Sequence, residues 1–237
     1  MTMEAKKTPE TPEKPEKPEK AEQKEKKPVS PEKERTFVYT LARIVAFLGN
    51  RTIFPVRYHG RENFDLNAPY IAMSNHKSAL DPLILAYPCK KYEIRFVGKK
   101  ELVKVKWIGN LLNKGLHMIT VDRHNSDMAA MRLCMKTLRE GYVLGIFPEG
   151  TRHHEDLMSE VETGAAVLAL RAKAPILPVY IESKPRLFRF NHVYIGKPMD
   201  ISDLAAQGFN TDVVEALCAR IRDTFHQMRR DAEKKER

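Results

Sequence analysis

Short apolar runs alternate with longer amphipathic stretches along most of the chain. The short runs, rich in Ile, Val and Leu, are typical of buried strands, and the longer stretches repeat apolar residues at helical spacing. We expect strands at 70–75, 94–98, 117–122, 143–150, 176–182 and 191–198. We expect helices at 82–88, 126–141 and 164–174, and a closing amphipathic helix from 211 onward. The alternation predicts an α/β fold in which helices flank a mainly parallel, mixed sheet.

The first apolar block, FVYTLARIVAFLGNRTIFPV at 37–56, differs from the rest. Two arginines interrupt it, so it falls short of the ~18 uninterrupted apolar residues of a membrane-spanning helix. Its polar positions follow one narrow helical face, at Thr36, Thr40, Arg43 and Asn50. We expect an amphipathic helix that lies in a membrane interface with its basic residues toward the headgroups. The alternative is a helix packed on the domain core.

Residues 1–35 show no pattern of either kind. The segment repeats the unit PEK and holds no large apolar residue beyond Met1, Met3 and Val29. Such a composition buries too little apolar surface to offset the entropy of ordering. We predict a disordered tail at 1–35, with a polyproline ligand as the alternative, an interfacial helix at 36–56 and one domain at 57–237.

Net charge narrows the class of partner. The chain carries +10, and because the tail holds ten Lys or Arg against nine Glu, the remainder carries +9. A basic domain favours an anionic partner, which leaves nucleic acid, an anionic membrane or a phosphorylated substrate. The sequence contains no nucleic-acid-binding motif, P-loop or zinc-type cysteine spacing, so we expect no nucleic acid and no metal. Its three cysteines without a CxxC pair favour core packing in a reduced compartment.

The segment SNHKSALDP, at 74–82, carries the first candidate chemistry. On a uniform helix His76 and Asp81 would point about 140° apart. However, Pro82 favours a helix start, with Asp81 as its N-cap, and so predicts a turn that can bring the two side chains together. A histidine held by a carboxylate is fixed in one tautomer and suited to take a proton from a hydroxyl.

A second polar segment, FPEGTR at 147–152, follows the apolar residues VLGI at 143–146. Its glycine permits close backbone approach, and Arg152 can hold a phosphate with two parallel hydrogen bonds. Lys99 in VGKKEL and Arg123 in ITVDR also follow apolar runs. Because ligands of open α/β sheets bind at the carboxyl ends of strands, these cations are candidates for one anion site.

Together SNHKSALDP, VGKKEL, GLHMITVDR, FPEGTR and ILPVYI resemble, in order and spacing, the motif blocks of the glycerolipid acyltransferase family. The resemblance covers about 57–198. Within the family, the chain is similar to bacterial enzymes that acylate the sn-2 hydroxyl of lysophosphatidate to give phosphatidate. The resemblance implies an acyl-CoA or acyl carrier protein co-substrate, a lysophospholipid acceptor and no cofactor.

The resemblance also implies roles for individual residues. His76 is the general base, and Asp81 orients it. Glu149, Gly150, Thr151 and Arg152 line the acceptor site, with Lys99, Arg123 and Arg152 as phosphate contacts. A backbone N–H near Gly150 is a candidate oxyanion donor. An enzyme acting on lipids must reach the bilayer, so we expect a peripheral or monotopic protein on the cytoplasmic side of the cell membrane.

The chain departs from the family pattern at HHEDL, where a serine usually follows FPEGTR, and at VETGAA, which lacks the usual basic residue. These departures leave glycerol 3-phosphate and other lysophospholipids open as acceptors. The cluster His153, His154, Glu155 and Asp156 resembles a metal site, but we expect a solvated loop. A non-catalytic basic module that binds membranes or nucleic acid is the alternative from a different class.

Overall fold

A computed structural model describes residues 36–67, 69–103, 110–121, 127–152 and 157–235. Its centre is a seven-stranded sheet in the order β1-β7-β6-β2-β5-β3-β4. The pair β6 and β7 is antiparallel, and every other pair is parallel. The strands are β1 (Val56–His59), β2 (Ile71–Ser74), β3 (Ile94–Lys99), β4 (Ile119–Val121), β5 (Val143–Ile146), β6 (Ile176–Ile181) and β7 (Asn191–Ile195). The predicted mainly parallel, mixed sheet is confirmed.

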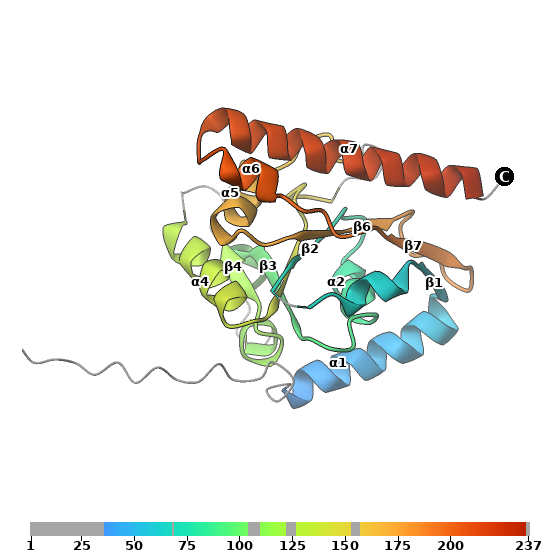
Figure 1. Cartoon of the computed structure of the whole chain (residues 1–237). Helices are drawn as coiled ribbons and strands as arrows, with labels where there is room; N and C mark the ends of the chain where they lie inside the picture. The colour runs from blue at the N-terminus through green and yellow to red at the C-terminus, as the bar shows by residue number, and fades with distance from the viewer. Residues whose placement is uncertain (1–35, 68, 104–109, 122–126, 153–156, 236–237) are drawn as a thin grey trace, which may run out of the picture.

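Helices cover both faces of the sheet (Figure 1). The α-helices are α1 (Phe37–Leu48), α2 (Asp81–Ala86), α4 (Met128–Arg139), α5 (Thr163–Ala172), α6 (Ser202–Ala206) and α7 (Thr211–Lys235). Shorter turns are η1 (Gly49–Ile53), η2 (Arg61–Asp65), η3 (Lys100–Val103) and η4 (Leu111–Gly115). Four of these helices, α4 to α7, lie on one face, whereas α2 lies on the other and α1 packs against α2.

The central strands are buried on both sides, which explains their continuous apolar sequence. In β2, Ile71 and Met73 join the core beneath α4 to α7, whereas Ala72 joins the core beneath α2. The long helix α7 closes the first core with an apolar stripe. Its buried members include Leu217, Ile221 and Phe225, as its sequence spacing predicts.

Two elements were absent from the sequence prediction. The edge strand β1 is only four residues long and directly follows the apolar block, so its period-2 pattern is too short to stand out. Helix α6 has only five residues.

The N-cap of α4 is Asp127, whose side chain accepts a hydrogen bond from the Ala130 N–H at 2.8 Å.

Helix α1 packs on the domain through its polar face. Tyr39 and Ala46 are buried, and the guanidinium of Arg43 donates hydrogen bonds to the carbonyl oxygens of Tyr87 and Cys89, at the end of α2. The expectation that Arg43 points toward headgroups is therefore wrong, because these carbonyls are without helical partners and attract the donor. Asn50 likewise bonds the Tyr58 hydroxyl at 2.9 Å.

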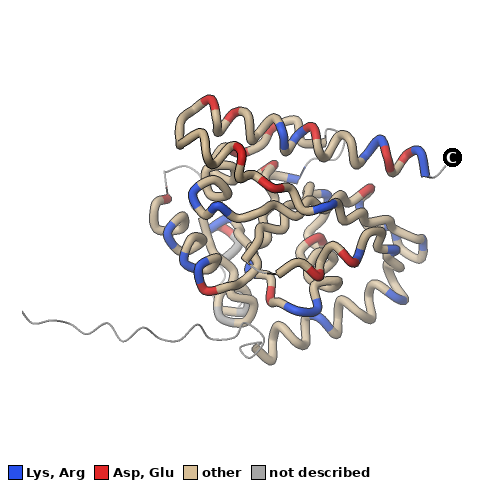
Figure 2. The backbone as a smooth tube through the Cα atoms, viewed as in Figure 1, with Lys and Arg blue, Asp and Glu red and all other residues tan. Residues whose placement is uncertain are grey.

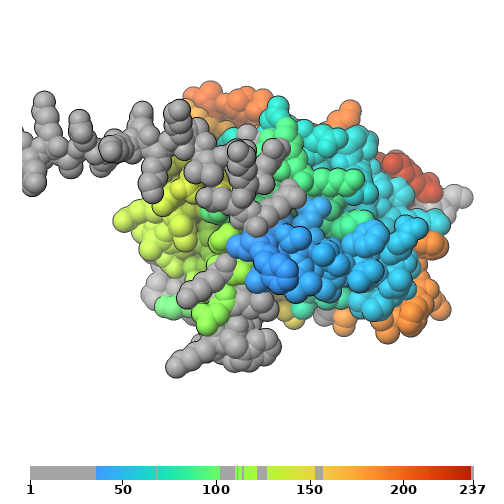
Figure 3. Space-filling model, turned by 90° about the horizontal axis from the view of Figure 1, so that it is seen from below, coloured from blue at the N-terminus to red at the C-terminus, as the bar shows by residue number. Residues whose placement is uncertain are grey.

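The opposite face of α1 is apolar and exposed. Most of its length carries no charge (Figure 2). Viewed from below, the helix forms part of the molecular surface (Figure 3). Its exposed large side chains are Phe37, Leu41, Ile44, Val45, Phe47 and Leu48. Of the helices in the described ranges, none combines the length and hydropathy that crossing a membrane requires.

Candidate active site

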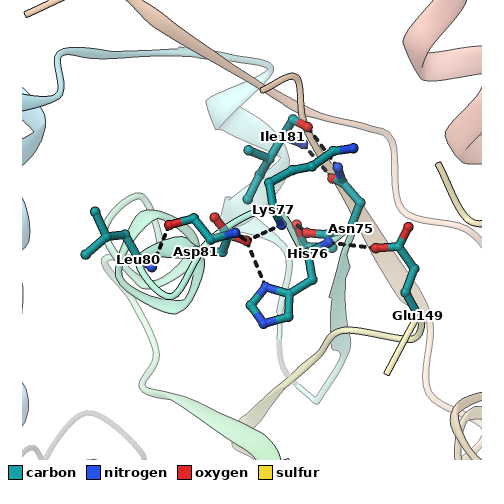
Figure 4. A network of polar contacts seen from close by, with 9 residues as sticks. Asn75, His76, Lys77, Leu80, Asp81, Glu149 and Ile181 are labelled. Carbon is teal, nitrogen blue, oxygen red and sulfur yellow. Dashed lines mark hydrogen bonds and ion pairs between the residues drawn. The ribbon is translucent and has the colours of Figure 1, made fainter. Parts of the chain in front are cut away.

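The turn after β2 carries both members of the predicted pair. Asn75 follows the strand and is buried, and it forms two hydrogen bonds with the backbone of Ile181 at the end of β6 (Figure 4). Its Nδ2 donates to the Ile181 carbonyl at 2.8 Å, and its Oδ1 accepts from the Ile181 N–H at 2.7 Å. Because both partners are backbone atoms of a central strand, His76 leaves the sheet at a fixed position.

The predicted hydrogen bond between the pair is present. His76 Nδ1 lies 2.8 Å from Asp81 Oδ2. The same carboxylate oxygen accepts from the N–H groups of Lys77 and Ser78, at 2.6 and 2.7 Å. Asp81 is nevertheless the first residue of α2 rather than its N-cap, which is Leu80. The N-cap prediction is wrong because the carboxylate turns back onto the preceding turn.

These contacts favour one tautomer of the imidazole. A carboxylate only accepts hydrogen bonds, so Nδ1 carries the proton and Nε2 is the basic nitrogen. Asp81 is fully buried, whereas the His76 side chain is 17% exposed and lines a cavity. The pair thus has a buried orienting group and a reachable base.

A row of stacked rings supports the imidazole. Phe147 stacks on His76 with ring centroids 4.3 Å apart, and Phe96 stacks on Phe147 at 6.1 Å. The row needs a glycine at 145, because a Cβ there would lie 2.5 Å from the Phe96 ring. Stacking and the Asp81 hydrogen bond therefore restrict His76 in two directions.

Glu149 joins the loop after β5 to the turn that carries His76. It is buried, and its Oε2 accepts the His76 backbone N–H at 2.8 Å (Figure 4). Its Oε1 accepts the Met158 N–H, also at 2.8 Å. Both oxygens thus accept hydrogen bonds from backbone N–H groups, so the geometry makes Glu149 a positioning residue for His76. Its assignment to acceptor binding stays a prediction.

Cationic side chains share the cavity of His76. This cavity, of about 350 Å³, is lined by Lys99, Gly150, Thr151 and Arg152 in addition to His76 and Phe147. Lys99 ends β3, and Arg152 lies in the loop after β5, so two strand ends converge there as predicted. Arg123, the third predicted cation, lies outside the described residues.

The backbone around Gly150 is engaged within its own turn. Gly150 has a left-handed φ of 71°, which favours glycine. Its N–H donates to the Phe147 carbonyl at 3.0 Å, and the Thr151 N–H donates to the Glu149 carbonyl at 2.7 Å. The expectation of an oxyanion donor near Gly150 is therefore wrong for these two groups in this conformation.

A larger cavity, of about 530 Å³, adjoins the first one. The two share Val97, Gly98 and Phe147, so Phe147 forms a wall between them. Side chains of α4 and α5 supply most of the larger cavity's lining, which is chiefly apolar. Cys134 lines it, but burial raises the pKa of this thiol to about 12. A thiolate nucleophile is therefore absent from Cys134 near neutral pH.

The candidate metal cluster at 153–156 lies outside the described residues. Within the ranges that the structure does describe, no group of three His, Cys, Asp or Glu side chains is arranged to hold a metal ion.

Sequence reasoning missed the positioning roles of Asn75 and Phe147. Asn75 directly follows β2 and Phe147 directly follows β5, and a position just after an apolar run is the signal that singled out His76 and Arg152. What the sequence did not reveal is their partners, because Ile181 lies 106 positions from Asn75 and Phe147 lies 71 from His76.

Comparisons with known proteins place these residues in a wider group. A family model described as Acyltransferase matches residues 55–182. A 1-acyl-sn-glycerol-3-phosphate acyltransferase of Bacillus subtilis (strain 168) is 32% identical over 71% of this chain and 87% of its own length. The protein of that name from Streptococcus pneumoniae is 28% identical over 83% and 75%, and the human alpha form is 28% identical over 72% and 62%.

The fold has a solved counterpart. The crystal structure of a 1-acyl-sn-glycerophosphate (LPA) acyltransferase from Thermotoga maritima aligns with a TM-score of 0.60 over 84% of this chain and 81% of that one. At 22% identity this likeness supports the shared α/β architecture alone.

Proposed function

The chain belongs to the acyltransferase family, and from that premise we propose that it transfers a fatty acyl group from a thioester to the sn-2 hydroxyl of lysophosphatidate. The product is phosphatidate. The observation that carries the proposal is the His76–Asp81 hydrogen bond beside a cavity that also holds Lys99 and Arg152.

The chemistry needs one base and no covalent enzyme intermediate. His76 Nε2 takes the proton of the acceptor hydroxyl as its oxygen attacks the thioester carbonyl. When the C–S bond breaks, the imidazolium returns the proton to the departing thiolate, which leaves as a thiol. Asp81 holds the ring in the reactive tautomer and stabilises its positive charge while the proton is in transit. Glu149, Asn75 and Phe147 position the ring.

The acceptor's phosphate supplies the anion that the sequence predicts. Lys99 and Arg152 converge on the cavity of His76 and match a phosphate in charge. Thr151 and Gly150 complete that lining, and Arg123 is proposed as a further contact from the sequence alone. Binding of the phosphate positions the glycerol hydroxyl relative to His76. The binding energy is thus used to orient the reacting groups.

The donor is an acyl thioester of coenzyme A or of acyl carrier protein. The larger cavity beside Phe147 suits its acyl chain, because the lining is mostly apolar and adjoins the reacting centre.

We also place the enzyme at the cytoplasmic surface of the cell membrane, as a peripheral or monotopic protein. The exposed apolar face of α1 supports this, since contiguous apolar surface of this kind marks an interaction site. Hydrogen bonds from Arg43 and Asn50 fix the helix with this face outward.

The test is acyl transfer by the purified full-length chain. Radiolabelled acyl-CoA and acyl carrier protein are each supplied with lysophosphatidate in mixed micelles. His76→Ala is expected to lower turnover by about 10²–10⁴-fold, the range for loss of a general base. Turnover within a few-fold of the parent would refute the role of His76.

His117 provides a matched control. It forms a hydrogen bond of the same kind to buried Glu93, at 2.7 Å, and lines neither cavity. His117→Ala is expected to retain turnover per folded molecule. Parallel reactions with glycerol 3-phosphate and other lysophospholipids test the rival acceptors, and sedimentation with DNA tests the non-catalytic alternative.

A further inference from the structure

The loop that joins β6 to β7, residues 182–190, exposes apolar and basic side chains together. Leu187, Phe188 and Phe190 are 58%, 77% and 51% exposed. Lys184, Arg186 and Arg189 alternate with them along the chain and are also exposed. An apolar cluster on the surface indicates a contact, and the cations indicate that the contacted surface is anionic.

A buried side chain fixes the shape of this loop. Asn191, the first residue of β7, accepts the Arg186 N–H with its Oδ1 at 2.7 Å. Its Nδ2 lies 3.1 Å from the Arg186 carbonyl and 2.9 Å from the Arg189 carbonyl. The loop is therefore held in one conformation rather than exposing its aromatic residues through disorder.

That conformation is unfavourable at Phe188. Its φ is 54°, in the left-handed region that non-glycine residues avoid, and its ring remains in water. Backbone strain and an exposed aromatic ring each cost stability, and no described packing of the ring offsets them. Such combinations are found where a side chain is presented to a partner.

The loop lies beside α1 and at the edge of the sheet that carries His76. The Phe188 N–H donates to the carbonyl of Ile53, in η1 directly after α1, at 2.8 Å. Figure 3 shows the same neighbourhood from below, with the orange loop region at the margin of the blue and cyan segment. Ile181, which precedes the loop, is the strand end clamped by Asn75.

We propose that loop 182–190 is a second membrane-contacting element, which inserts Leu187 and Phe188 among the lipids of an anionic bilayer while its arginines bind the headgroups. This rests on the membrane attachment proposed for α1. With contacts on both α1 and the loop, the carboxyl edge of the sheet faces the bilayer, and an acceptor lipid reaches His76 with little displacement from the membrane.

An environment-sensitive fluorophore tests the insertion directly. The three native cysteines are buried, so Leu187→Cys can be labelled selectively with nitrobenzoxadiazole. Position 187 is preferred because the backbone at 188 is strained. Vesicles of phosphatidylglycerol should shift the emission to the blue and raise its intensity. Label at Phe209→Cys, which is equally exposed on the face covered by α5 to α7, should not respond.

Charge reversal tests the headgroup contact. Arg186→Glu with Arg189→Glu should weaken binding to anionic vesicles by at least about tenfold, since each basic residue near such a surface contributes about 1 kcal/mol. Arg222→Glu with Arg230→Glu, on α7, is the matched control and should bind within about threefold of the parent. Transfer to a monodisperse short-chain acceptor should be unchanged in both variants.

The outcomes separate this inference from the membrane attachment of α1. If the parent fails to sediment with vesicles, both fail. If it sediments and Phe47→Ser weakens sedimentation, yet the label at 187 stays in water, only the loop inference is overturned. A blue shift that needs acyl carrier protein or a higher concentration of the enzyme instead of lipid would assign the loop to a protein partner and also overturn it.

Discussion

Two histidine–carboxylate pairs occur in the part of the chain that the structure describes, and of these two only one lies beside a cavity that suits the reaction. His76 and Asp81 are 2.8 Å apart at the carboxyl edge of the sheet, next to Lys99 and Arg152. His117 and Glu93 are 2.7 Å apart near the amino ends of β3 and β4. The hydrogen bond is the same, so the bond alone does not identify a catalytic base.

The difference lies in how the two carboxylates are supported. Asp81 Oδ2 accepts two backbone N–H groups besides the imidazole. Glu93 instead faces Arg95, with Nε 4.0 Å from Oε1. Each carboxylate also has one buried oxygen, Asp81 Oδ1 and Glu93 Oε2, without a hydrogen bond from the described residues, so the contrast lies in the oxygen that binds the imidazole. The first carboxylate is held by the rigid turn that also carries its histidine. The second joins two separate segments, which is a structural task.

The largest expected difference between the two pairs appears when each carboxylate is replaced by its neutral amide. Asp81→Asn keeps the size of the side chain but places an amide where the imidazole N–H must be accepted, so His76 loses its reactive tautomer. Turnover should fall by about 10²–10⁴-fold. Glu93→Gln should leave turnover within about threefold. Steady-state acyl transfer measures both, and equal losses in the two variants would abolish the distinction drawn between the pairs.

A smaller effect is expected at Glu149, which accepts hydrogen bonds from the backbone N–H groups of His76 and Met158. Glu149→Gln keeps one oxygen, so one of the two backbone N–H groups loses its acceptor, at a cost of about 1–3 kcal/mol. If the His76 turn shifts in consequence, kcat should fall by about 10–100-fold while KM for lysophosphatidate changes little. A change confined to KM would instead support the acceptor-binding role predicted from the sequence.

The smallest effect concerns the pH dependence of stability and comes from Tyr39 in helix α1. The Tyr39 hydroxyl accepts the Ile94 N–H at 3.1 Å, and burial raises its pKa from 10.0 to about 12. Its contribution to stability is therefore complete below pH 10 and is lost as the pH rises toward 12. Through this window the free energy of unfolding should fall by up to about 1.4 kcal/mol per pH unit from this group.

Urea unfolding at pH 8, 10 and 11 measures this contribution. Tyr39→Phe should be less stable than the parent at pH 8, because the buried Ile94 N–H loses its acceptor. Its stability should also fall less steeply above pH 10. Parallel stability curves for the parent and Tyr39→Phe would show that Tyr39 does not contribute to the alkaline loss.

The sequence predicted most of the sheet because its central strands are buried on both sides and read as continuous apolar runs. It also brought His76, Lys99 and Arg152 to one edge, because parallel strands share their carboxyl ends. The packing of α1 was not predictable in the same way. Its polar face contacts backbone carbonyls at the end of α2. The sequence around Arg43 does not indicate whether its guanidinium binds a backbone carbonyl or a lipid headgroup.

The position of Phe147 has a consequence for anyone who wishes to alter the products of this enzyme. Its ring stacks on His76 and separates the two cavities. Under the proposed assignment of the acceptor and the acyl chain to these cavities, a substitution there would change reactivity, head-group choice and chain-length choice together. Helix α5 offers a cleaner starting point. Val167 and Leu168 line the larger cavity and not the cavity of His76. Under the same proposed assignment, libraries at these positions would vary chain selectivity without disturbing proton transfer.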